Sequence, residues 1–277
     1  MTLTMSIRHN FSLRSVIGGA ALGALLLSGC DAAARPSAIG TPFPVRIAAT
    51  TVNQQMPPAV ATAQAAADAS PNDPDASYRL GNALSIAASE EPDAALRRTY
   101  FEGAITAYKR ALELKPADAA VLHNLGTAYL QIGDLATAAR QFEAALAIDD
   151  SDPKTLYMVG TIYLQQDQYG SPQTNLRARE KFEAALRIDP TLAVAYVGLA
   201  QISINEGDAA GALENARKGV ELSGDAVDPF TYWQLAQAQC ATGDIAGGTE
   251  TLNKILAANV PNDAFNQQVR MLMDACK

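Results

Sequence analysis

The chain is poor in the side chains that most catalytic and metal sites require. It has only two histidines in 277 residues, His9 and His123. It also lacks the G-x-x-x-x-G-K-[ST], HExxH, G-x-S-x-G and CxxC patterns, which serve phosphate binding, zinc binding, serine nucleophiles and thiol exchange. We therefore expect no catalytic residue, no metal site and no cofactor.

Positively charged residues are also scarce. The chain has 21 lysines and arginines against 29 aspartates and glutamates, a net charge of −8. Nucleic acid and anionic lipid are recognised by clustered lysine and arginine, so this balance argues against both as partners. An acidic, solvated surface that aids solubility explains the charge without any further role.

What the chain does have is a repeating pattern with a period of 34 residues, the distance from Gly126 to Gly160. Each unit places a large, a small and an aromatic residue in its first half and Ala-x3-aromatic in its second. The matching segments are Leu125-Gly126-x-x-Tyr129 with Ala138-x3-Phe142, and Val159-Gly160-x-x-Tyr163 with Ala178-x3-Phe182. This pattern resembles the tetratricopeptide repeat (TPR), a helix-turn-helix unit, and the resemblance implies an all-α solenoid.

We expect about five such repeats, at residues 74–118, 119–152, 153–192, 193–228 and 229–262. The first repeat carries 11 extra residues between its halves, and the last two are degenerate at Ala216 and Gly248. Asp-Pro pairs that begin at residues 73, 152 and 228 are predicted helix starts. Gly-Asp pairs that begin at 133, 207 and 243 are predicted turns between helices. Residues 56–73 and 263–277 are predicted capping helices.

The first thirty residues predict export to a membrane surface. Residues 1–29 carry two arginines, no acid and a short apolar run, which is typical of a signal peptide. The run ends in Leu27-Ser28-Gly29-Cys30, which resembles the lipobox of bacterial lipoproteins. That resemblance makes Cys30 the lipidated anchor, faces the protein toward the periplasm and leaves the choice of membrane open. The alternative is a plain signal or a free thiol.

Residues 30–55 are rich in Ala, Pro and Thr and predict a flexible tether that spans at most about 85 Å. Removal of the signal would leave 19 basic against 29 acidic residues and a net charge of −10. Beyond Cys30, only Cys240 and Cys276 remain, and in an oxidising periplasm they are a candidate disulfide. The alternative is two buried thiols, or a free Cys276.

The first helices line the concave face of tetratricopeptide arrays, and two residue columns there predict a binding groove. One column is mostly aromatic and the other carries only amides and hydroxyls, which suits an extended or helical peptide. The aromatic column contains Tyr78, His123, Tyr157, Val197 and Trp233, and the polar column Asn82, Thr127, Thr161, Gln201 and Gln237. Neither column contains Lys or Arg, so a clamp for acidic C-termini is not expected. The rings can alternatively fill space between repeats.

Together these features predict a membrane-anchored scaffold that binds segments of envelope proteins. Short lipoproteins of this kind resemble the TadD-type components of Flp pilus systems and the lipoproteins of type IV pilus assembly. A second hypothesis is an NlpI-like adaptor that recruits peptidoglycan hydrolases or a protease. The third hypothesis, an enzyme with a site in the insertions Ser89–Thr99 or Gln168–Gln173, is the weakest because such a site lacks a histidine and a metal cluster.

Overall fold

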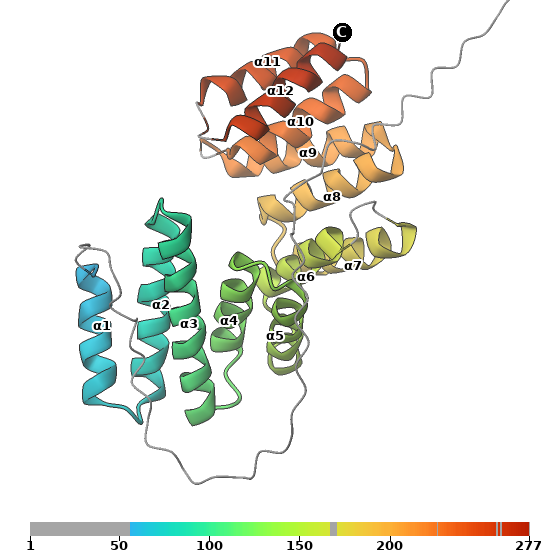
Figure 1. Ribbon diagram of the computed structural model, residues 1–277. Coiled ribbons are helices and arrows are strands. Elements are labelled where there is room, and N and C mark those ends of the chain that lie inside the picture. The colour runs from blue at the N-terminus through green and yellow to red at the C-terminus, as the bar shows by residue number, and fades with distance from the viewer. Residues whose placement is uncertain (1–55, 167–170, 226, 259, 261, 277) are drawn as a thin grey trace, which may run out of the picture.

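A computed structural model describes residues 56–166, 171–225, 227–258, 260 and 262–276. These described residues form twelve α-helices and no β-strand, as the all-α prediction required (Figure 1). The helices are α1 Pro58–Ala69, α2 Pro74–Glu90, α3 Ala94–Leu114, α4 Ala119–Gln131, α5 Leu135–Ile148, α6 Pro153–Gln166, α7 Pro172–Ile188, α8 Ala193–Glu206, α9 Ala209–Ser223, α10 Pro229–Ala241, α11 Ile245–Ala257 and α12 Asp263–Ala275.

The helices form a solenoid of antiparallel pairs. Five pairs, α2/α3, α4/α5, α6/α7, α8/α9 and α10/α11, follow one another, with α1 against the first and α12 against the last (Figure 1). The helices α1 to α4 stand upright in this view, whereas α8 and α10 to α12 lie across it, so the stack turns along its length. We call the surface lined by α2, α4, α6, α8 and α10 the first-helix face.

The predicted starts and turns are confirmed. The carboxylates of Asp73, Asp152 and Asp228 accept hydrogen bonds from backbone amides in the first turns of α2, α6 and α10. In the turns, Gly133, Gly207 and Gly243 have φ angles of 85°, 78° and 83°, which side chains with a Cβ rarely adopt. Local sequence therefore determines where each helix begins and how each pair reverses direction.

Within the first three pairs, a glycine of the first helix faces a buried ring of the second. A Cβ added to these glycines would lie 2.4 Å, 2.9 Å and 2.7 Å from the nearest ring atom, distances that real Cβ atoms do not show. The facing residues are Gly81 and Tyr108, Gly126 and Phe142, and Gly160 and Phe182. The small residue thus lets the two helix backbones approach while the ring fills the space between them.

The last two pairs change both members of this contact together. At the equivalent positions, Ala200 and Ala236 replace the glycine, and Ala216 and Leu252 replace the ring. All four side chains are fully buried. The methyl group added on the first helix replaces part of the volume lost on the second, and the smallest combined volume is that of Ala200 with Ala216.

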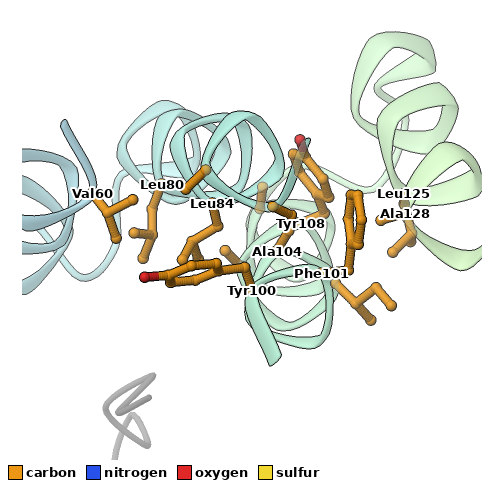
Figure 2. Close-up of a cluster of buried hydrophobic side chains, with 14 of the residues drawn as sticks. Val60, Leu80, Leu84, Tyr100, Phe101, Ala104, Tyr108, Leu125 and Ala128 are labelled. Carbon is orange, nitrogen blue, oxygen red and sulfur yellow. The ribbon is translucent and has the colours of Figure 1, made fainter. Parts of the chain in front are cut away.

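Most of the extra residues of the first repeat extend its two helices, and the segment Ser89–Thr99 is exposed apart from the half-buried Glu91 and Leu96. They lengthen α2 to 17 residues and α3 to 21, and only residues 91–93 connect the two helices. The added length buries Tyr100 and Phe101 against the cluster that contains Leu84 and Leu125 (Figure 2). The insertion therefore adds buried side chains just beyond Ser89–Thr99, whereas that segment itself stays on the surface.

We predict that Gly81→Ala destabilises the fold. Tyr108 cannot move aside easily, because its hydroxyl is hydrogen-bonded to Asn82 and Ser85. Overpacking of this kind costs about 1–3 kcal/mol of unfolding free energy. Helix propensity alone favours Ala over Gly by about 1 kcal/mol, so the two effects have opposite signs. Urea unfolding followed by circular dichroism measures the change, and a more stable variant would contradict the close approach.

Candidate functional site

The aromatic column lies on the first-helix face, but its rings also pack inside their own repeats. Tyr78, His123 and Tyr157 are half-buried. Their ring centroids lie 6.0 Å, 5.4 Å and 5.8 Å from those of the second-helix rings Tyr108, Phe142 and Phe182. Each ring therefore has one side in the interior and one edge toward the first-helix face.

Val197 and Trp233 do not line an open groove. They are 5% and 7% exposed, and Trp233 packs against Phe265 of α12 with ring centroids 5.8 Å apart. Trp233 also belongs to the hydrophobic cluster that joins α10, α11 and α12. The structure thus gives Trp233 a packing role, whereas the binding role of the half-buried rings stays a prediction.

In the N-terminal part of the solenoid, the polar-column residue Asn82 forms hydrogen bonds within the protein. The amide oxygen of Asn82 accepts hydrogen bonds from the Tyr108 hydroxyl at 2.8 Å and from the Asn124 amide at 3.0 Å. Asn124 also donates to the Tyr78 hydroxyl at 3.1 Å. Burial raises the pKa of Tyr108 to about 12, against an opposing hydrogen bond from Ser85, so the phenol stays a donor. These bonds join α2, α3 and α4.

The two threonines of this column bond to their own helices. The hydroxyl of Thr127 donates to the carbonyl of His123 at 3.1 Å, and that of Thr161 to the carbonyl of Tyr157 at 3.0 Å. Such bonds to the preceding turn leave the hydroxyl oxygen as an acceptor only. Thr127 and Thr161 therefore offer a partner fewer donors than the sequence suggested.

His123 completes the polar contacts between α4 and α6. Its Nδ1 lies 2.6 Å from the hydroxyl of Thr155, which in turn donates to the cap residue Asp152. Burial lowers the pKa of His123, the Asp152 carboxylate raises it, and Lys154 lowers it further. The lowered pKa favours the neutral imidazole, so His123 contributes a hydrogen bond to this contact rather than a positive charge.

In the C-terminal part the amides are incompletely paired. Gln234 donates to the Gln201 amide oxygen at 2.6 Å, and Gln201 donates to Asn205 at 2.9 Å. The Oε1 atoms of Gln234 and Gln237 are buried and accept no hydrogen bond from the described residues. An unpaired buried amide oxygen costs free energy, so these two groups favour an added donor.

Sequence reasoning missed the residues that connect one repeat to the next. Asn124 and Gln234 occupy the same place in α4 and α10, and each donates to the polar-column residue of the preceding first helix. Thr155 and Phe265 likewise share a place in α6 and α12, and each contacts the aromatic-column residue before it. Asn124 and Gln234 each directly follow an aromatic-column residue in the sequence, and this recurrence could have indicated a contact between repeats.

Cys240 and Cys276 are joined by a disulfide, in agreement with the pairing expected from the sequence. It connects the end of α10 to the end of α12, with the two Cα atoms 5.2 Å apart. Gly248 of α11 lies beneath it, because an added Cβ would be 2.7 Å from the sulfur of Cys240 and 3.1 Å from that of Cys276. The glycine that looked like repeat degeneracy therefore makes room for the bond.

Several predicted features lie outside the residues that the structure describes. Cys30, the signal and the tether precede the described residues, and residues 168–170 of the second insertion also lie outside them. The remainder of that insertion, at Ser171 to Gln173, caps and begins α7.

Across the described chain, no three His, Cys, Asp or Glu side chains gather as a metal site. None of the helices described has the length and apolar character to cross a membrane.

Comparisons with known proteins agree with this geometry. Family models for the TPR repeat and the tetratricopeptide repeat match residues 100–133 and 119–152. No curated protein matches the chain. The stacked helix pairs and these matches define a tetratricopeptide-repeat fold, which is a protein-interaction scaffold.

Solved structures of such proteins share the fold at low sequence identity. TTC0263, a thermophilic TPR protein in Thermus thermophilus, is 18% identical with a TM-score of 0.54, over 74% of this chain and 98% of that one. YrrB, a TPR protein with an unusual peptide-binding site, is 18% identical with a TM-score of 0.51, over 74% and 96%. PilW, a widely conserved type IV pilus biogenesis factor, is 17% identical with a TM-score of 0.58, over 76% and 88%.

We predict that the disulfide stabilises the last repeat and its cap. The two cysteines are 36 residues apart, and closing such a loop contributes about 3–4 kcal/mol in the chain-entropy model. Cys276→Ser should lower the midpoint of thermal unfolding, and reductant should lower it for the wild type but leave the variant unchanged. Two alkylatable thiols at these positions in exported, unreduced protein would contradict the bond.

Proposed function

We propose that this protein is a lipid-anchored adaptor of the bacterial cell envelope that binds segments of other envelope proteins from the periplasmic side. The observation that carries the binding role is the stack of five helix pairs, which presents a continuous first-helix face. No enzyme chemistry is needed, since the face offers rings, amides and hydroxyls rather than a nucleophile beside a base.

Two features support the envelope address. The sequence Leu27-Ser28-Gly29-Cys30 ends an apolar run and resembles a lipobox. At the other end of the chain, Cys240 and Cys276 form a disulfide, a bond that persists in oxidising compartments such as the periplasm. Diacylation of Cys30 would hold the scaffold at a membrane, because each buried methylene contributes about 0.8 kcal/mol.

The specific form of the proposal is a role in assembling a pilus or secretion machine. Its support is the sequence resemblance to TadD-type lipoproteins, together with the fold shared with PilW. Adaptors of peptidoglycan hydrolases use the same fold, so the identity of the captured proteins decides between the two. Captured pilins or a secretin would fit the first role, and captured cell-wall enzymes the second. Neighbouring genes for an ATPase, a secretin and a pilin prepeptidase would also favour the first role.

We predict that Cys30→Ala abolishes lipid labelling. The expected anchor is the acyl groups on this sulfur, so the variant should leave the membrane fraction or stay there through its uncleaved signal. Metabolic labelling with palmitate measures the change, and Cys276→Ser is the control because it also removes one cysteine but leaves Cys30 in place. Equal labelling of Cys30→Ala and the wild type would refute the lipoprotein assignment.

We also predict that Tyr157→Ala weakens capture of envelope proteins. Loss of a ring anchor at an interface centre commonly costs about 2 kcal/mol of binding. Pull-down from envelope extracts with mass spectrometry measures capture, and thermal melting measures folding. Tyr163→Ala removes the same ring from the same helix, but from the half-buried position toward α5 and α7, and should retain more binding.

Two reference outcomes complete this test. Leu125→Ala deletes a buried core side chain and should cost about 2–5 kcal/mol of unfolding free energy without touching the face directly. If Tyr157→Ala and Tyr163→Ala lose capture in proportion to their melting temperatures, folding explains the effect. If Tyr157→Ala captures envelope proteins as well as the wild type does, the first-helix face is not the binding surface.

A further inference from the structure

The first-helix face is not uniform along the solenoid. In its N-terminal part the polar groups are paired within the protein, since Asn124 donates to Asn82 and to the Tyr78 hydroxyl. The imidazole of His123 is bonded to the Thr155 hydroxyl. In its C-terminal part, two apolar side chains are left open to solvent. Val194 of α8 is 37% exposed and Phe230 of α10 is 52% exposed.

These two side chains occupy the same position, the second residue, of successive first helices. The preceding repeats place Asp75, Ala120 and Lys154 there, so the position carries a large apolar side chain only in the last two. The hydrogen bond from Gln234 of α10 to Gln201 of α8 fixes the two helices side by side in register. Phe230 therefore lies along the same edge of the first-helix face as Val194.

A negative charge adjoins this apolar pair. Asp228 caps α10, where its carboxylate accepts from the amides of Phe230 at 2.8 Å and Thr231 at 3.1 Å. Its other carboxylate oxygen accepts from the Thr231 hydroxyl at 2.5 Å, and the residue is exposed. The charge is therefore held at the start of α10, beside Phe230.

We propose that Val194, Phe230 and Asp228 form the docking edge for a partner segment that carries an aliphatic or aromatic side chain next to a Lys or Arg. The apolar side chain covers Val194 and Phe230, and the cation faces the carboxylate of Asp228. Charge complementarity selects this partner, because the chain carries a net charge of −8 and an acidic segment would be repelled. This proposal rests on the adaptor function and names its ligand class.

The probe is a displayed library of random 12-residue peptides, selected on the full chain in detergent. Selected peptides should be enriched in an apolar residue within four positions of a Lys or Arg. A synthetic copy of the strongest peptide then serves for fluorescence anisotropy, together with a copy whose basic residues are replaced by Glu. The Glu copy should bind at least tenfold more weakly, and the difference should shrink as salt screens the charge.

Two variants test the edge itself, each with a matched control. Phe230→Ala should weaken the selected peptide about tenfold or more, whereas Leu176→Ala, with 54% exposure on the second helix α7, should not. Asp228→Asn keeps a good helix cap but removes the charge, and should also weaken binding. Its control is Asp208→Asn, the same change at the cap of α9.

The outcomes distinguish the docking edge from the adaptor function. Selection of acidic peptides or of none, or full binding by Phe230→Ala and Asp228→Asn, overturns the docking edge. If the wild type still captures envelope proteins in that case, the adaptor function stands without it. A wild-type dimer that Phe230→Ala converts to a monomer overturns the proposal in favour of a second copy as the occupant.

Discussion

The close approach of the two helices in each repeat is the contact on which the rest of the structure depends. In the first three repeats a glycine meets a ring, as Gly126 meets Phe142. The distance between the paired helices follows from that contact, and with it the position of each first helix relative to the next. Hydrogen bonds between these repeats, such as Asn124 to Asn82, depend on that spacing.

The polar side chains on the first-helix face divide the array into two kinds of surface. The bonds among Tyr78, Asn82 and Asn124 satisfy polar groups that burial would otherwise penalise, and they fix one repeat against another. A partner must break these bonds before it can use the groups. The last two repeats have fewer such bonds and expose Val194 and Phe230, so binding there displaces less of the protein's own structure.

The sequence predicted those parts of the fold that local chemistry controls. Turns such as Gly133-Asp134 and caps such as Asp73 depend on neighbouring residues, and they formed where expected. The column of candidate ligands was harder, because a residue's place on a helix does not say whether a neighbouring repeat already binds it. Trp233 illustrates the limit, since the side chain that buries it, Phe265, lies on the capping helix.

The disulfide has a consequence for how the solenoid ends. An α-solenoid exposes an apolar face at its last repeat, and a further repeat from another molecule is the natural group to cover it. Here α12 covers that face through Val269 and Leu272, and the bond from Cys276 to Cys240 holds it there covalently. Because α12 is held covalently, this apolar face stays covered even when the surrounding contacts loosen, and it is not free to stack against another molecule.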